Sequence, residues 1–181
     1  MKWFATKKSD STQLLAQAFD RYYLQIYRYF RFRGVNVEEA KDLASRTFEM
    51  AIQHWNQFDP QKGQIQTWLF AIAHNLAINH WKIEKTMATD PLNDDLPDYG
   101  KDDFENRIIT QEHRGQLLAA LNSLDLRSRQ IIALKFGGPL TNRQIGQLMD
   151  ISEQNVAVIL FRSLMKIRKK LANGEVNDDN R

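Results

Sequence analysis

Hydrophobic residues recur along this chain at steps of three and four positions, which is the spacing of amphipathic helices. In the first half, this spacing predicts helices over residues 11–33, 37–55 and 66–85. Gly34 ends the first helix, and a turn built on Asp59, Pro60 and Gly63 precedes the third. No segment shows the strict apolar–polar alternation of a strand, so the pattern predicts an all-α chain.

The second half predicts four more helices. They cover residues 114–124, 127–138 and 141–150, and a fourth helix follows Ser152. Thr141 and Gln144 have the spacing of a capping box, and Ser152 is a favoured N-cap residue. With the apolar Ile151 in the short turn between them, the last two helices are typical of a helix-turn-helix. The alternative is a plain helical hairpin with a solvated basic end.

Residues 86–110 break this periodicity. They contain two of the four prolines and a cluster of acidic residues, which is the composition of a flexible linker. The alternative is a solvated surface loop, although so long a loop is uncommon inside one compact domain. We therefore predict two small helical domains, residues 10–85 and 111–172, joined by a flexible acidic linker, with the helix-turn-helix in the second domain.

The charge of the chain is unevenly distributed. Basic and acidic residues number 9 and 8 in residues 10–85, 2 and 7 in 86–110, and 10 and 4 in 111–172. Positive charge thus collects in the C-terminal third, while the net charge of the whole chain is only +3. This distribution favours a nucleic-acid partner for the C-terminal domain.

Composition narrows the remaining chemistry. The chain has no cysteine, which excludes disulfides and thiolate sites and fits a reducing cytoplasm. No apolar run is long enough to span a membrane, and the first residues lack the core of a signal peptide. His74 and His80 are six positions apart, which is not the spacing of a helical metal pair, and no phosphate-binding loop or nucleophile motif is present. We expect no catalytic residue, no metal and no cofactor.

Two helices carry candidate binding chemistry. Residues 63–85 combine aromatic rings, amides and cations, a set that suits unstacked bases and phosphates, although for Trp68 and Trp81 themselves a place in the core is favoured over base stacking. A helical wheel of the last helix gives it two faces. The predicted core face contains Val156, Leu160, Ser163, Leu164, Ile167 and Leu171. The predicted outer face contains Asn155, Val158, Arg162, Met165 and Lys169. Asn155 can pair with adenine and Val158 can contact a thymine methyl, so we predict recognition of an A/T-rich element.

These segments, in this order, resemble the extracytoplasmic-function (ECF) group of bacterial RNA polymerase sigma factors. FDRYYLQIYRYFRFRG and EEAKDLASRTFEMA are similar to the first conserved stretch of that family, and DPQKGQIQTWLFAIAHNLAINHWK to the second. LNSLDLRSRQIIALKF and LTNRQIGQLMDIS resemble its C-terminal region. The resemblance covers about residues 14–171.

The resemblance implies a subunit that binds core RNA polymerase, directs it to promoters and helps to open the minus-10 element. Contact with the polymerase clamp is expected at Glu39, Asp42, Leu43, Arg46 and Glu49. Capture of an extruded minus-10 base is expected at Asp59, Gln64, Thr67, Trp68, His74, Asn75, Asn79, Lys82 and Lys85. Recognition of the minus-35 element is expected at Arg143, Ser152, Asn155, Val158, Arg162, Lys166 and Lys169. An anti-sigma partner and a cytoplasmic location are further expectations.

The chain departs from the family pattern at several positions. Ser45 and Arg46 stand where Gln-Glu is common, and Asn79 stands where Asp is common. Asp150 replaces the usual glycine of the helix-turn-helix turn, and Ala157–Ile159 replace the usual polar residues of the recognition helix. Two alternative functions therefore stay open here: a helix-turn-helix regulator that works without polymerase, and an adaptor that binds only proteins.

Overall fold

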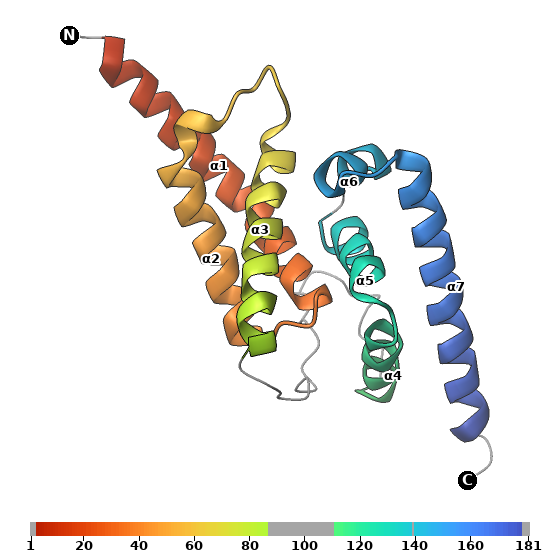
Figure 1. The fold of residues 1–181 in the computed structure, drawn as a ribbon. Coiled ribbons are helices and arrows are strands. Elements are labelled where there is room, and N and C mark those ends of the chain that lie inside the picture. The colour runs from red at the N-terminus through yellow and green to blue at the C-terminus, as the bar shows by residue number, and fades with distance from the viewer. Residues whose placement is uncertain (1–2, 87–110, 139, 179–181) are drawn as a thin grey trace.

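The computed structural model describes residues 3–86, 111–138 and 140–178, and every regular element in these ranges is a helix (Figure 1). The all-α prediction is confirmed for this part of the chain. None of the described helices is both long enough and apolar enough to cross a membrane. The predicted linker, apart from Thr86, lies outside the described residues.

The first half contains three long helices, α1 (Trp3–Phe32), α2 (Val37–Gln53) and α3 (Ile65–Thr86), and a short 3-10 helix, η1 (Trp55–Gln57). Gly34 adopts a φ of 95°, which allows the sharp turn after α1. Asn36 then caps α2, because its side-chain oxygen accepts a hydrogen bond from the Glu39 amide at 2.9 Å. The apolar faces of the three helices bury Ile26, Phe30, Phe48, Leu69 and Phe70.

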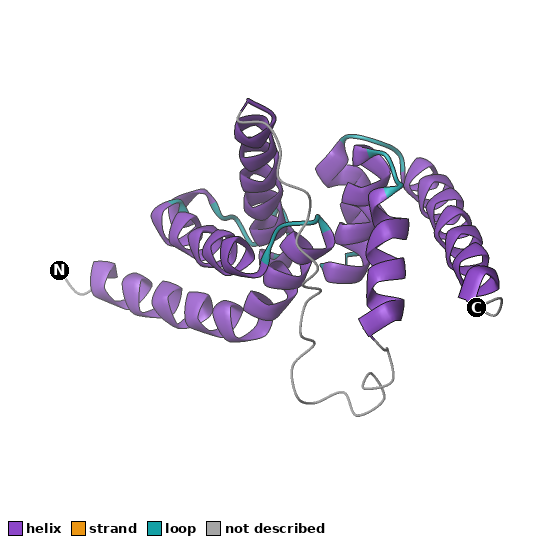
Figure 2. Ribbon diagram, turned by 90° about the horizontal axis from the view of Figure 1, so that it is seen from below, coloured by secondary structure: helices purple, strands orange, loops and turns teal. Residues whose placement is uncertain are grey.

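The second half contains α4 (Gln111–Asn122), α5 (Leu126–Ile132), α6 (Asn142–Met149) and α7 (Glu153–Asp178). The predicted capping box is confirmed, since Thr141 and Gln144 each bind the other's backbone at the start of α6. Asp150 takes the left-handed conformation, with φ 53° and ψ 51°, that the turn into α7 requires. Helix α7 contacts α4, α5 and α6 and lies at the outer edge of the molecule (Figures 1 and 2).

One predicted helix is irregular. Residues 127–138 were expected to form a single α-helix, but the last turn is a π-helix, η3 (Ala133–Gly137), which continues directly from α5. Such turns widen a helix locally and often occur at functional sites. This one brings the backbone of Gly137 and Gly138 against the first half of the chain.

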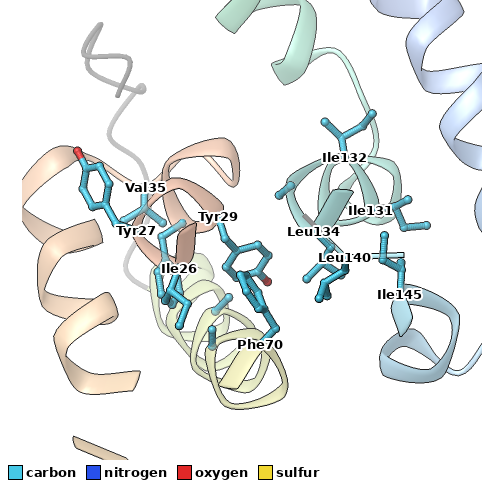
Figure 3. Packing of buried hydrophobic residues seen from close by; sticks show 14 of the residues in the cluster. Ile26, Tyr27, Tyr29, Val35, Phe70, Ile131, Ile132, Leu134, Leu140 and Ile145 are labelled. Atoms are coloured by element: carbon cyan, nitrogen blue, oxygen red, sulfur yellow. The ribbon is translucent and has the colours of Figure 1, made fainter. Parts of the chain in front are cut away.

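The two halves are in direct contact rather than separate. Helices α1 and α3 pack against η3 and α6, and one continuous cluster of buried side chains runs through both halves. Figure 3 shows Tyr29 and Phe70 on the side of the first half that faces Leu134 and Leu140. The two helical domains predicted from the sequence therefore share a core in this conformation.

Candidate polymerase and nucleic-acid interfaces

The five residues expected to contact polymerase lie on the outer side of α2 and along its flank. Asp42, Arg46 and Glu49 are exposed, while Glu39 and Leu43 are half-buried. Leu43 packs on the core, and the Glu39 carboxylate lies 3.8 Å from the imidazole of His80 on α3. The result is a charged, solvent-facing strip anchored on a rigid helix.

The turn between α2 and α3 is built around three aromatic rings. The ring centroids of Trp55, Phe58 and Trp68 lie 5.2–6.0 Å from one another, in tilted and edge-on arrangements. Next to them, the Asp59 side chain accepts a hydrogen bond from the Gln61 amide at 2.9 Å and lies 3.7 Å from the Lys62 ammonium. These contacts fix the shape of the turn.

This turn borders an open groove of about 870 Å³. Its lining mixes rings, amides and cations: Arg21, Tyr22, Trp55, Phe58, Gln61, Lys62, Gln64 and Gln66 are among them. A flat base can stack on a ring here while amides meet its polar edge and a cation meets phosphate. Gln64 was expected at this site, whereas Trp55, Phe58, Arg21 and Tyr22 were not. The pair Trp55–Phe58 just before the Asp59 turn was the available sequence signal.

Helix α3 presents its expected residues unequally. Asn75 and Asn79 are exposed, Thr67 and Trp68 are half-buried, and the side chains of Lys82 and Lys85 lie outside the described residues. His74 differs from the rest, because it is only 7 % exposed and faces the core. In this conformation, His74 cannot reach DNA.

His74 belongs instead to a buried polar chain. Its Nδ1 lies 3.3 Å from the Tyr29 hydroxyl, which accepts a hydrogen bond from the Arg33 guanidinium at 3.2 Å. Arg33 also faces the side-chain amide of Gln130 on α5, in the other half of the molecule. Burial, together with the charge of Arg33, lowers the pKa of His74 from 6.5 to about 4. His74 is therefore neutral at pH 7.

The helix-turn-helix exposes its expected DNA-facing residues. Arg143, Ser152, Asn155, Val158, Arg162 and Lys169 are all exposed. Ser152 also caps α7 by accepting a hydrogen bond from the Asn155 amide at 3.1 Å. Lys166 is exposed as well, but its ammonium donates to the Ser123 carbonyl at the end of α4, so it also ties the helix to its own domain.

The predicted core face of α7 needs one correction. Val156, Leu160, Ser163 and Ile167 are buried as expected, but Leu164 is 44 % exposed. It lies at the edge of the core stripe, where the neighbouring helices no longer cover it. Together with Val158, Phe161 and Met165, which are also exposed, it forms an apolar strip on the outside of α7.

Within the described residues, no three histidine, cysteine or carboxylate side chains come together in a group that could hold a metal ion. What they present is a helical unit with a charged strip and an aromatic groove, followed by a helix-turn-helix. A helix-turn-helix behind such a unit is typical of a helical DNA-binding protein.

Comparison with known proteins identifies both units. Residues 18–86 match the model of sigma-70 region 2, and residues 120–169 match the model of sigma-70 region 4. The ECF RNA polymerase sigma factor SigM of Bacillus subtilis is 28 % identical over 167 residues, which is 90 % of this chain and 98 % of SigM. The chain belongs to the sigma-70 family of RNA polymerase sigma factors, in its ECF group.

Solved structures agree on the fold. The structure of CnrH in complex with the cytosolic domain of CnrY superimposes with a TM-score of 0.68 at 18 % identity, covering 93 % of this chain and 94 % of that one. The sigma factor RpoE of Bartonella quintana, in complex with the anti-sigma factor NepR, superimposes with a TM-score of 0.64 at 16 % identity. This match covers 87 % of this chain and 96 % of that one. The presence of both regions in this order does not favour a regulator that acts without polymerase.

Proposed function

We propose that this ECF sigma factor divides promoter recognition among three surfaces: the outer side of α2, the aromatic groove, and the start of α7. The observation that carries the proposal is that both conserved regions are present in one chain, with three of the five expected contact residues of α2 and all of those on α7 exposed. The protein then acts in the cytoplasm as a transcription initiation factor rather than as an enzyme.

The outer side of α2 binds the clamp of core polymerase. Its exposed charges, Asp42, Arg46 and Glu49, supply electrostatic complementarity, and the half-buried Leu43 supplies apolar contact. Because Arg46 stands where an acid is common in the family, the facing polymerase surface is expected to carry a matching negative group.

The aromatic groove captures a base that leaves the stack at the minus-10 element. Extruding a base costs a few kcal/mol, and stacking on a ring recovers about 1–3 kcal/mol. Trp55 and Phe58 provide the stacking surface, and Gln61 and Gln64 provide donors and acceptors for the edge of the base. Asn75 and Asn79 continue this polar surface along α3.

The first turns of α7 recognise the minus-35 element in the major groove. Asn155 and Val158 meet base edges, while Arg162 and Lys169 meet phosphate or guanine. Arg143 on α6 is exposed beside them and extends the phosphate contact.

A protein partner also fits this chain. Both solved structures described above are complexes, one with the cytosolic domain of CnrY and one with the anti-sigma factor NepR. The exposed apolar strip on α7 is the kind of surface that such a partner covers. Chain isolated from its host with no bound protein and with full promoter activity would contradict this part of the proposal.

The variant Arg46→Glu tests the polymerase surface. It reverses one exposed charge on the proposed contact side and should weaken binding to core polymerase by about tenfold or more, measured with labelled chain in a titration. Lys41→Glu is the matched control, because it makes the same charge change on the same helix outside the proposed contact set. Equal affinity of the two variants for core would show that α2 does not make this contact.

A further inference from the structure

Helix α1 forms one wall of the aromatic groove through Leu14, Arg21 and Tyr22, and the turn between α2 and α3 forms the other. Among the described residues that line the groove, two are charged, Arg21 on α1 and Lys62 on the turn, and both are cations. No carboxylate belongs to this described lining. A groove that has a positive group on each wall and aromatic rings in its lining is complementary to an anionic strand that carries bases.

The Arg21 side chain is exposed, and the ring beside it holds it in position. Its guanidinium carbon lies 5.4 Å from the centroid of the Tyr22 ring, within the range of a cation–π contact. Tyr22 is only 8 % exposed, so its ring is a fixed platform. Within the described part of the chain, the guanidinium of Arg21 has no carboxylate partner. Its planar set of donors is therefore available to a phosphate, which it can bind through two parallel hydrogen bonds.

Lys62 is placed to make a second charge contact. Its side chain is 85 % exposed, and its ammonium lies 3.7 Å from the Asp59 carboxylate, which is longer than a hydrogen bond. Ion pairs as exposed as this one contribute little to stability. The ammonium can therefore exchange Asp59 for a phosphate at small cost.

The α3 edge of the groove makes contacts within the protein instead. The side-chain oxygen of Gln64 accepts a hydrogen bond from the Gln144 amide at 3.3 Å, and the Gln66 amide donates to the carbonyl of Gly138 at 3.4 Å. Arg21 and Lys62, by contrast, are open to solvent. The electrostatic contacts of an incoming strand therefore fall on α1 and on the turn.

We propose that Arg21 is a phosphate-binding residue and that, together with Lys62, it holds the backbone of a single DNA strand across the groove while a base lies on the aromatic rings. This inference deepens the function proposed for the groove and rests on it. It adds α1 to the minus-10 surface and gives the strand a path from the turn to α1. Because both contacts are to the backbone, they act on every base sequence alike.

The variant Arg21→Ala tests this contact through the salt dependence of binding. The full chain and its variants are titrated with a pool of random-sequence single-stranded DNA 12-mers at several salt concentrations. Loss of one phosphate contact should reduce the slope of log affinity against log salt concentration by about 0.7, which is on the order of an eightfold weaker affinity at about 50 mM salt. Arg21→Lys should keep the slope, because the charge remains. Arg127→Ala is the matched control, since it removes the same charge from an exposed site on α5 that does not line the groove.

Two further arms test the path of the strand. Lys62→Ala should reduce the slope as much as Arg21→Ala does, and the double variant should reduce it by about 1.4, because the two residues contact different phosphates. Duplex 12-mers should bind Arg21→Ala and the parent equally, since paired bases cannot enter the groove.

The inference would be overturned by an unchanged slope in Arg21→Ala on single strands, or by an equal loss of affinity on duplex and single strands. A parent chain that does not bind the single strands would overturn it as well. Failure of the proposed function is a separate result, namely the absence of promoter-specific starts when the parent chain is added to core polymerase.

Discussion

Asn155 lies in the first turn of α7, where its backbone amide is already satisfied by Ser152 and its side chain is exposed. This leaves the side-chain amide available to pair with one adenine. Asn155→Ala should therefore relax sequence preference at a single position of the minus-35 element by about 1–3 kcal/mol. The measurement is the affinity of polymerase carrying each variant for duplexes that differ at one base pair.

Lys169→Ala is the companion variant. Losing a phosphate contact should weaken binding to all sequences alike, and it should reduce the slope of log affinity against log salt concentration by about one. If Asn155→Ala instead weakens binding to every sequence equally, the orientation proposed for α7 on DNA is incorrect.

His74 makes stability depend on pH. Its pKa is about 4 in the folded protein and 6.5 when unperturbed, so the unfolded chain binds a proton that the folded chain excludes. The contribution of neutral His74 to the stability is fully present above pH 6.5, and it is lost as the pH falls from 6.5 towards 4. We expect a loss of about 2 kcal/mol between pH 7 and pH 5.

Urea unfolding of the full chain at several pH values measures this loss. His74→Gln should remove most of it, whereas His80→Gln, on the same helix but partly exposed, should not. A His74→Gln chain that still loses the same stability over this range would show that other groups carry the effect.

For single residues, the sequence predicted exposure only where helical periodicity alone determines it. Asn155 and Val158 could be placed on the exposed side of α7 because a wheel needs only helical periodicity. Leu164 and His74 could not, since their exposure depends on which helices pack beside them. Gly137 looked like part of a helix stop, and its role as a contact point with Tyr29 requires knowing that α1 lies there.

At the scale of the elements, local chemistry determined the ends of helices well. Asn36 caps α2 and Thr141 caps α6, each through a contact with the residue three positions later. Because such a contact is local, the spacing of Thr141 and Gln144 was enough to predict the cap of α6. The π-turn at Ala133–Gly137 was not expected, because no local pattern distinguishes it from a continuing α-helix.

The capping box of α6 supports the helix-turn-helix. Thr141→Ala removes the hydroxyl that accepts from the Gln144 amide at 3.2 Å, and it should lower the free energy of unfolding by about 1 kcal/mol. Thr141→Ser keeps the hydroxyl and should lose much less. Chemical denaturation of the three chains makes the comparison, and equal stability of Thr141→Ala and the parent would show that the cap adds nothing here.

At the scale of the whole molecule, the order of the two regions was evident from the sequence, but their contact was not. Periodicity and the acidic stretch after Thr86 predicted two units, and the matches to regions 2 and 4 confirm them as sigma-70 regions. The contact depends on two glycines and three glutamines spread over more than 70 positions. No pattern within one element could reveal it.

We propose that this chain gives core RNA polymerase its promoter specificity. The most direct measurement adds the purified full chain to core polymerase with a library of promoter sequences and maps the 5′ ends of the transcripts. We expect transcripts to start at a discrete set of sites that share an A/T-rich upstream element, and these starts should vanish when the chain is omitted. Transcripts that start at random sites, or a chain that forms no complex with core polymerase, would contradict it.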